Sequence, residues 1–314
     1  MRILFAGTPL FAVAPLEKIN KNHFICGVLT SPDKPVGRKR KLTVSPVKRK
    51  AEELNLRVFQ PDKINEEFYS TVKGLKADIL VVVAFGKIFK RSFVDIFPRG
   101  GINLHPSLLP KYRGPSPIPA AILNGDSETG VTVQTLTDRV DSGDILGQLS
   151  YKLSGKETTG ALAEILSEQG SRLIEDVLEN IEKNNLLPAA QDESKATYCG
   201  KIKKEDGLIL WDKSAVAIDR MVRAYAPWPG GYTFWGKYKL TVKEGTVYPD
   251  SIADIISVPG KVLGTDKKYG ILVNTGKGVY CIRDIQPECR KSMSWKAFLN
   301  GHPEIIGSVL GGEL

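Results

Sequence analysis

The 314-residue chain is poor in histidine and cysteine and has no long apolar run. Its three histidines are scattered and its four cysteines form no C-x-x-C pair, so we expect reduced thiols and no metal site. No apolar run approaches the roughly 18 residues of a membrane-spanning helix. The N-terminal segment MRILFAGTP enters a strand-like run without a signal-peptide pattern. These absences predict a cytoplasmic protein without a membrane partner.

Two common nucleotide-binding motifs are also missing. The turn after the first strand-like run holds a single glycine, Gly7, whereas the dinucleotide fingerprint needs three spaced glycines. The phosphate-binding pattern G-x-x-x-x-G-K-[ST] does not occur, and no serine or cysteine elbow indicates a covalent nucleophile. The sequence therefore favours neither a nicotinamide enzyme nor an ATPase.

What the first half of the chain does contain is an alternation of apolar strand-like runs and helical segments. Near-continuous apolar runs of strand length are typical of buried parallel strands. The β-α order predicts a doubly wound, mostly parallel, Rossmann-like α/β sheet, in which ligands bind beyond the carboxyl ends of the strands. The expected strands and helices are Arg2–Ala6, Phe24–Thr30, Asp78–Ala84 and Gly101–Leu104, and Pro9–Asn20, Val47–Asn55 and Asn65–Gly74.

The character of the sequence changes in its last third. Residues 190–206 belong to a polar stretch without a sustained period, which predicts a linker. Beyond it, residues 231–283 give short strand-like runs separated by Gly, Asp and Lys turns, a spacing typical of a small β-barrel. We therefore expect a catalytic domain over 1–189 and a C-terminal barrel domain over 207–314.

Asn103 and His105 are the strongest candidates for chemistry. They lie two residues apart at the end of the apolar run at 101–104, and alternate strand residues point to the same face. Pro106 disfavours helix at His105 and keeps it extended. An amide donor and an imidazole are thus expected side by side at a strand end.

A carboxylate is expected beside this histidine. Asp138, Asp141 and Asp144 follow within a short stretch around Ser142-Gly143. A carboxylate near an imidazole fixes its tautomer and raises its pKa. The spacing of the residues leaves the choice among the three acids open.

One segment dominates the net charge of +9. Its proline and glycine residues predict a loop, and a basic loop suits contacts to the phosphates of a nucleic acid. A solvated charged face is the alternative reading. The segment covers residues 34–50 and carries Lys34, Arg38, Lys39, Arg40, Lys41, Lys48, Arg49 and Lys50 without an acid.

At these residues the chain resembles the folate-dependent formyltransferases. Asn103-x-His105, Ser107-Leu108-Leu109-Pro110 and the DSGD motif around Asp141 resemble the motif of the whole group. The opening FAGTPLFA, the basic loop SPDKPVGRKRKL and Pro227-Trp228-Pro229 resemble the members that act on methionyl-tRNA. The resemblance runs from about residue 2 to the end.

The resemblance implies a function and a set of roles. The enzyme would transfer the formyl group of 10-formyltetrahydrofolate, without a metal, to the α-amine of initiator methionyl-tRNA. The basic loop, residues 31–44, would enter the acceptor stem, and the barrel would be an oligonucleotide-binding-like (OB-fold-like) domain that flanks it; no obligate protein partner is implied. For catalysis the resemblance implies that Asn103 and His105 would stabilise an oxyanion intermediate and that Asp141 would orient His105. The other implied residues are Ser107, Leu108, Leu109 and Pro110 for folate, and Arg38, Lys39, Arg40 and Lys41 for tRNA.

Several alternatives share parts of this pattern. A glycinamide ribonucleotide formyltransferase would need no second domain. A formyltransferase acting on an amino-sugar nucleotide, or a 10-formyltetrahydrofolate hydrolase, would have no evident need for the basic loop. A non-catalytic RNA-binding protein would explain the charge and the barrel but would leave Asn103, His105 and Asp141 unexplained.

Overall fold

The computed structural model describes residues 1–36, 41–249 and 258–311 and divides into two compact units. The first comprises Met1–Pro117, Glu128–Lys152 and Leu162–Gly200. The second comprises Ile118–Ser127, Leu153–Ala161 and Lys201–Leu314, so two short segments from earlier in the chain pack with the C-terminal region. No helix within the described ranges is long and apolar enough to span a membrane.

A seven-stranded sheet forms the centre of the first unit. Its strands are β1 (Arg2–Gly7), β2 (Phe24–Leu29), β5 (Val58–Phe59), β6 (Ile79–Val83), β7 (Gly101–His105), β8 (Glu128–Thr135) and β9 (Ile145–Lys152). They lie in the order β5-β2-β1-β6-β7-β8-β9. The pairs from β5 to β7 are parallel, and β8 and β9 continue the sheet antiparallel. The predicted doubly wound, mostly parallel sheet is confirmed.

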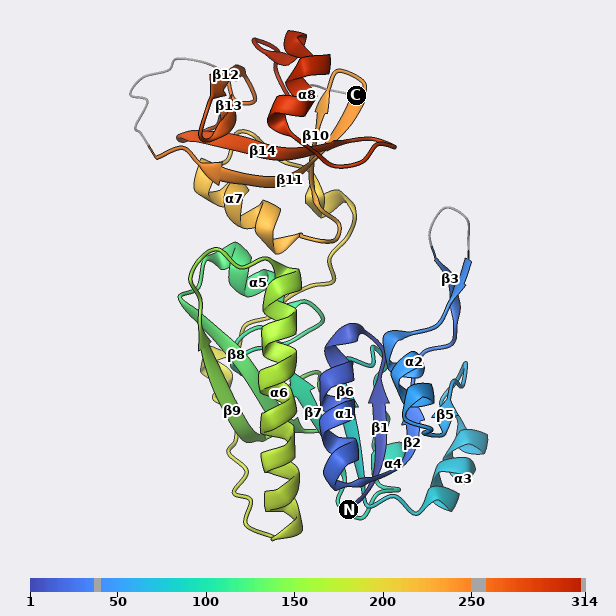
Figure 1. The fold of residues 1–314 in the computed structure, drawn as a ribbon. Helices are drawn as coiled ribbons and strands as arrows, with labels where there is room; N and C mark the ends of the chain where they lie inside the picture. Colours follow the sequence, from blue (N-terminus) through green and yellow to red (C-terminus); the bar gives the residue numbers. More distant parts are fainter. Residues whose placement is uncertain (37–40, 250–257, 312–314) are drawn as a thin grey trace. The chain divides into compact units, whose positions relative to one another are not determined.

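Helices cover both faces of this sheet (Figure 1). Side-chain caps begin two of them: Ser45 accepts a hydrogen bond from the backbone of Lys48, and Asn65 accepts one from that of Phe68. The predicted helix start at Pro9 is wrong, because a 3-10 turn precedes the first α-helix. The elements are η1 (Leu10–Ala12), α1 (Val13–Asn22), α2 (Pro46–Glu53), α3 (Glu66–Leu75), α4 (Arg91–Val94) and α6 (Thr159–Glu182), with η2 (Glu193–Lys195) beyond them.

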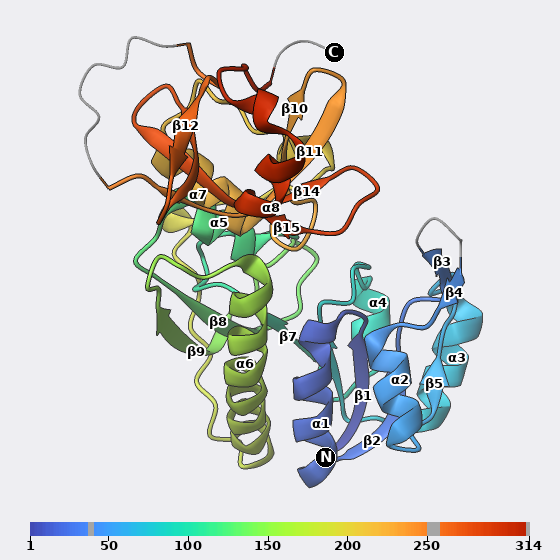
Figure 2. The ribbon, with the colours of Figure 1, turned by 45° about the horizontal axis from the view of Figure 1, so that its top comes forward.

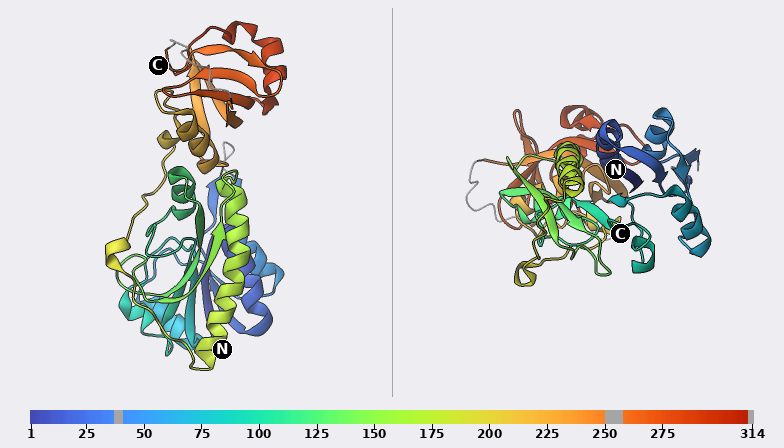
Figure 3. Two further views of the ribbon diagram at one scale, coloured as in Figure 1. Left: turned by 90° about the vertical axis from the view of Figure 1, so that its left-hand side faces the viewer. Right: turned by 90° about the horizontal axis from the view of Figure 1, so that it is seen from below.

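The two faces of the sheet bury different side chains. Phe68 of α3 and Phe93 of α4 belong to one core cluster with Leu4 and Leu80 of the sheet. On the other face, α6 lies along the sheet (Figure 3), and its Gly170 lies directly against the side chain of Leu104 in β7. Because strand residues alternate, the neighbours of Leu104 point away from α6. The fold thereby sets the direction of Asn103 and His105.

Within the segment predicted to be a basic loop, residues 31–44, two short strands pair with each other. Strands β3 (Lys34–Val36) and β4 (Lys41–Thr43) pair antiparallel. The predicted tRNA-binding residues Arg38, Lys39 and Arg40 lie outside the described residues, and Lys41 is described only as the first residue of β4.

The second unit contains an antiparallel sheet in the order β10-β11-β14-β13-β12, with β15 paired to β14. Its core includes Trp211, Tyr280 and Phe298, and the Trp211 indole donates to the Thr233 hydroxyl. Helix α7 packs against β11, and α8 packs against β14 and β15 (Figure 2). The predicted C-terminal domain of short strands is confirmed as an antiparallel sheet. Its elements are α5 (Pro117–Asn124), η3 (Glu205–Gly207), α7 (Ala215–Ala224), β10 (Gly231–Trp235), β11 (Tyr238–Val247), β12 (Val262–Asp266), β13 (Gly270–Asn274), β14 (Val279–Pro287), β15 (Met293–Ser294), α8 (Trp295–Gly301) and η4 (Pro303–Ile305).

Candidate active site

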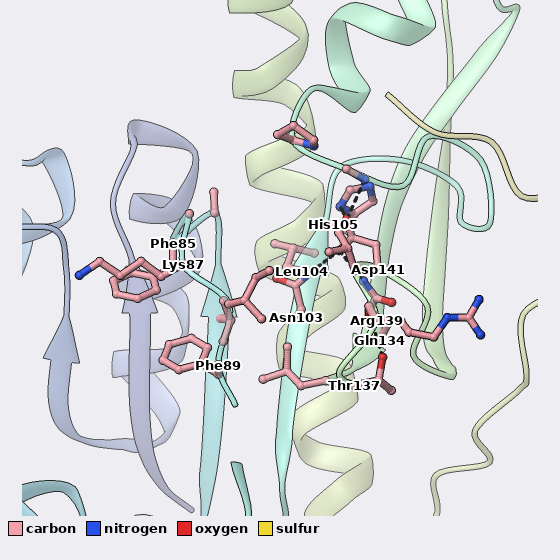
Figure 4. A pocket seen from close by; sticks show the side chains of 18 of the residues that line it. Phe85, Lys87, Phe89, Asn103, Leu104, His105, Gln134, Thr137, Arg139 and Asp141 are labelled. Atoms are coloured by element: carbon pink, nitrogen blue, oxygen red, sulfur yellow. Dashed lines mark hydrogen bonds and ion pairs between the residues drawn. The ribbon is translucent and has the colours of Figure 1, made fainter. Parts of the chain in front are cut away.

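Asn103 and His105 lie at the carboxyl end of β7, an interior strand between β6 and β8. Ile102 and Leu104, the alternate residues, are fully buried in the core. Both Asn103 and His105 line a cavity beyond the ends of β6 and β7 (Figure 4). This is the edge at which ligands bind in open α/β sheets, as the sequence predicts.

Asp141 lies beside them on the turn that follows β8. Its first carboxylate oxygen, Oδ1, accepts hydrogen bonds from the Gln134 side chain at 3.0 Å and, at 3.4 Å, from the Asn103 amide. Its second oxygen, Oδ2, accepts one from the backbone N–H of Gly114 at 2.9 Å. These three donors hold the carboxylate in place. The backbone of Asp141 is left-handed, with φ of 50°, a conformation that L-residues seldom adopt.

His105 is turned so that its two ring nitrogens have different partners. Nε2 lies 2.9 Å from the backbone oxygen of Tyr112, and because a carbonyl only accepts, Nε2 carries the hydrogen. Nδ1 lies 3.6 Å from Asp141 Oδ2. Burial lowers the pKa of His105 below its ordinary value, and Asp141 opposes this in part. The neutral ring is thus favoured, with a lone pair on Nδ1.

The cavity has a volume of about 490 Å³ and a mostly apolar wall. Phe85 and Phe89, whose rings stack at 5.3 Å, line it together with Leu136. Two cationic residues, Lys87 and Arg139, also line it (Figure 4). Pockets of this size that combine apolar walls with a few polar groups typically bind small organic molecules.

The four residues predicted to lie along folate follow β7 in a hydrogen-bonded turn. Ser107 is fully buried, and its hydroxyl donates to the backbone oxygen of Lys111. The Thr132 hydroxyl ties the same turn together by donating to the Ser107 carbonyl and accepting from the backbone of Leu109. None of Ser107, Leu108, Leu109 and Pro110 is among the described residues that line the cavity.

Two lysines of the basic segment form ion pairs. Lys48 pairs with Asp33 at 2.6 Å and thereby lowers the pKa of that carboxyl. Lys50 pairs with Glu17 and Glu53, which raise the pKa of its ammonium. Part of the charge counted in the sequence is therefore engaged inside the protein.

Sequence reasoning missed the residues that hold the site together. Gln134 is a buried amide in β8, next to the buried Val133, and a large amide beside apolar strand residues is the one local signal that could have marked it. Arg113 and Gln191 also lie close to the Asp141 turn. Gln191 falls in the segment predicted to be a linker and carries no distinguishing pattern. Across the described ranges, no group of three or more His, Cys, Asp and Glu residues is placed to hold a metal.

A doubly wound domain with an amide, an imidazole and a carboxylate at one cavity, followed by an antiparallel domain, defines a two-domain α/β enzyme. The family model "Formyl transferase" matches residues 1–178, and "Formyl transferase, C-terminal domain" matches residues 201–303. The methionyl-tRNA formyltransferase of Treponema denticola is 43% identical over 316 residues, 98% of each chain. That of Carboxydothermus hydrogenoformans is 40% identical over 309 residues, 98% of this chain and 99% of the relative. The chain belongs to the formyl transferase family, within the group of methionyl-tRNA formyltransferases.

Solved structures share the fold at lower identity. An N-formyltransferase from Helicobacter canadensis, in complex with folinic acid and dTDP-3-aminofucose, has a TM-score of 0.66 at 23% identity and covers 89% of this chain and 98% of its own. The methionyl-tRNA formyltransferase from Clostridium thermocellum has a TM-score of 0.55 at 19% identity, with coverages of 79% and 94%. HypX from Aquifex aeolicus, solved also with tetrahydrofolic acid, has a TM-score of 0.65 at 16% identity, and the match spans 98% of this chain but half of HypX.

Proposed function

We propose that this enzyme transfers the formyl group of 10-formyltetrahydrofolate to the α-amine of initiator methionyl-tRNA, giving N-formylmethionyl-tRNA and tetrahydrofolate. The observation that carries the proposal is the cluster of Asn103, His105 and Asp141 at the cavity rim. The names of the full-length relatives support the acceptor substrate. In this proposal the domain over 1–189 carries out catalysis. The enzyme is cytoplasmic and needs no obligate protein partner.

The reaction is a direct transfer between two nitrogens. The neutral methionyl amine attacks the formyl carbon, which forms a C–N bond and places negative charge on the formyl oxygen. The amine gives up a proton, the bond from N10 of the folate to the formyl carbon breaks, and N10 receives a proton. Neither a redox step nor a covalent enzyme intermediate is needed to balance these steps.

His105 is suited to move that proton through Nδ1. In the neutral ring Nδ1 is unprotonated, because Nε2 keeps its hydrogen on the Tyr112 carbonyl. Once Nδ1 accepts a proton, the Asp141 carboxylate at 3.6 Å stabilises the charged ring. His105 therefore acts first as an acceptor, and it donates only after it has become protonated.

Asn103 is then the side-chain donor available to the developing oxyanion before any proton moves. An amide nitrogen carries two hydrogens, so Asn103 can keep its contact to Asp141 and offer the second hydrogen to the formyl oxygen. One such donor is typically worth about 3–4 kcal/mol in the transition state.

The cavity provides a place for the folate. Its aromatic and apolar wall suits a flat ring system such as that of a folate. Related structures named for complexes with tetrahydrofolic acid and folinic acid support this choice of co-substrate. Contacts from Ser107, Leu108, Leu109 and Pro110 to the folate stay a prediction. In the structure, Ser107 bonds with Lys111 and Thr132 in the turn that follows β7.

The tRNA would be held by the basic loop and the C-terminal domain. The residues proposed to contact its phosphates are Arg38, Lys39, Arg40 and Lys41. In the same basic segment, Lys48 and Lys50 are engaged with acids. The domain predicted over 207–314, an OB-fold-like module in this proposal, would flank the acceptor stem.

A single assay tests the proposal. The enzyme is mixed with 10-formyltetrahydrofolate and initiator methionyl-tRNA, glycinamide ribonucleotide, an amino-sugar nucleotide, or water alone. Formyl transfer to methionyl-tRNA only is the expected result. If either nucleotide is formylated instead, the proposed acceptor is wrong. The same holds if 10-formyltetrahydrofolate is hydrolysed in water alone as fast as it is consumed with methionyl-tRNA. No turnover with any of them would favour a non-catalytic RNA-binding protein.

A further inference from the structure

The amide of Gln191 lies against the turn that carries Asp141. Its nitrogen Nε2 donates to the backbone oxygens of Asp141 at 3.0 Å and Gly143 at 2.7 Å, and lies 3.3 Å from the side-chain oxygen of Gln134. These contacts join residues about 50 positions apart in the sequence. They bind both ends of the Asp141 turn to one side chain.

Gln191 is itself held by Arg113. Two guanidinium nitrogens of Arg113 donate to the Gln191 oxygen, at 2.8 and 3.1 Å. Arg113 is 1% exposed and also pairs with Glu193 at 2.8 Å. Because a guanidinium can only donate, it fixes the Gln191 amide with its oxygen toward Arg113 and its nitrogen toward the turn.

This orientation is passed on to the carboxylate. The Gln134 oxygen accepts from the backbone of Gly143 at 3.1 Å and faces the Gln191 nitrogen, so the Gln134 nitrogen is left to donate to Asp141 at 3.0 Å. A flipped Gln134 would place its oxygen against the Asp141 carboxylate. The left-handed backbone of Asp141 is a conformation that persists only where the surrounding contacts hold it, and these hydrogen bonds supply such contacts.

We propose that Gln191 is a positioning residue that, held by Arg113, keeps the Asp141 carboxylate turned toward His105. This inference rests on the proposed function for its catalytic consequence. Gln191 is not among the residues that line the described cavity, so it acts through Gln134 and the Asp141 turn rather than on a substrate. The segment that enters the second unit thereby takes part in the chemistry of the first.

The alternative is that Gln191 only fastens its own segment to the domain. Backbone pairs already do this on both sides of it: Ala189 pairs with Ile145, and Thr197 and Cys199 bond with Arg113. Those contacts do not depend on the Gln191 side chain. A purely structural Gln191 would therefore alter thermal stability without altering the state of His105.

Two substitutions separate these roles. Gln191→Met removes the amide at nearly the same length. Gln191→Glu keeps an oxygen acceptor for Arg113 but loses the donor to the turn, so it retains the attachment and removes the positioning contact. Lys195→Ala, an exposed residue of the same segment paired to Asp192, is the matched control.

The first readout is the pKa of His105 in the free enzyme. It is measured from the ring NMR signals of the three histidines, and the signal of His105 is assigned by its loss in His105→Gln. Asp141 is the charged group facing His105, and the Cys199 thiol, kept protonated by burial that raises its pKa, lies at the same Tyr112 carbonyl. We expect Gln191→Met to lower the His105 pKa by about half a unit or more, since a nearby opposite charge typically shifts a pKa by about 1–3 units.

The second readout is turnover. We expect both Gln191 variants to lower kcat about tenfold or more and to change KM for methionyl-tRNA less than twofold. Lys195→Ala should behave as the unchanged enzyme. An unaltered His105 pKa in folded Gln191→Met, or native kcat in Gln191→Glu, overturns the proposal. If Gln191→Met does not fold, kcat of Gln191→Glu decides. Absence of formyl transfer by the unchanged enzyme would refute the proposed function, while the His105 pKa would still test the positioning.

Discussion

The Nδ1 atom of His105 lies 3.6 Å from a carboxylate oxygen of Asp141, while Nε2 of the same ring is held by the Tyr112 carbonyl. Burial lowers the pKa of His105, and the Asp141 charge raises it again in part. The ring is thus kept neutral near neutral pH yet has a counter-ion ready when it accepts a proton. Both properties suit a group that takes a proton and later returns it.

We expect Asp141→Asn to lower kcat at least as strongly as loss of an oxyanion donor and to move the acid limb of the kcat profile to lower pH. Removing the carboxylate removes the influence that raises the His105 pKa, so the ring stays neutral to more acidic pH, but its charged form is less stabilised. Single-turnover rates measured as a function of pH check this. An acid limb at the same pH would break the proposed pairing of His105 and Asp141.

We expect Asn103→Ala to lower kcat by about 10²–10³, the typical effect of losing one oxyanion donor. Its affinity for methionyl-tRNA should stay nearly unchanged, because Asn103 lies at the cavity rim in the α/β domain and belongs to none of the predicted tRNA contacts. Steady-state kinetics and a tRNA filter-binding assay measure the two effects. A variant with near-native kcat would remove Asn103 from the mechanism.

Local patterns predict the framework of this site well. Buried parallel strands are continuous apolar runs, so β1, β6 and β7 are visible in the sequence. Strand alternation predicts that Asn103 and His105 share a face, and the packing of Leu104 on Gly170 of α6 agrees with it.

Contacts between distant segments were not predictable in the same way. Asp138, Asp141 and Asp144 are equally spaced, and only the turn, with its donors from Gln134 and Gly114, brings Asp141 to His105. A polar residue such as Gln191 gives the same sequence signal whether it is bound to a turn or solvated. Charge counting likewise could not show that Lys48 and Lys50 are paired with acids.

We expect Arg38→Ala to weaken tRNA binding and to reduce the slope of log Kd against log salt by about one, the loss of one phosphate contact. Lys50→Ala, in the same basic segment, is the matched control. Its ammonium is engaged with Glu17 and Glu53, so its slope should match that of the unchanged enzyme. Binding is measured between about 50 and 200 mM salt, a range over which phosphate contacts weaken strongly. Equal slopes for the two variants would reduce the loop to a solvated charged face.

Two helical glycines provide a test of how closely α6 supports the catalytic strand. A methyl group at Gly170 would lie 2.6 Å from a Leu104 methyl carbon, whereas one at Gly74 of α3 would meet no atom within 4 Å. We expect Gly74→Ala to stabilise the protein by about 0.5–1 kcal/mol, because alanine favours helix. Gly170→Ala gains the same preference but overpacks a buried contact, which typically costs about 1–3 kcal/mol, so we expect net destabilisation. Because Leu104 lies between Asn103 and His105, kcat should fall as well. Urea unfolding and kcat of the two variants check this. Equal stabilisation by both would show that β7 can shift to accommodate the added methyl group without a cost in stability.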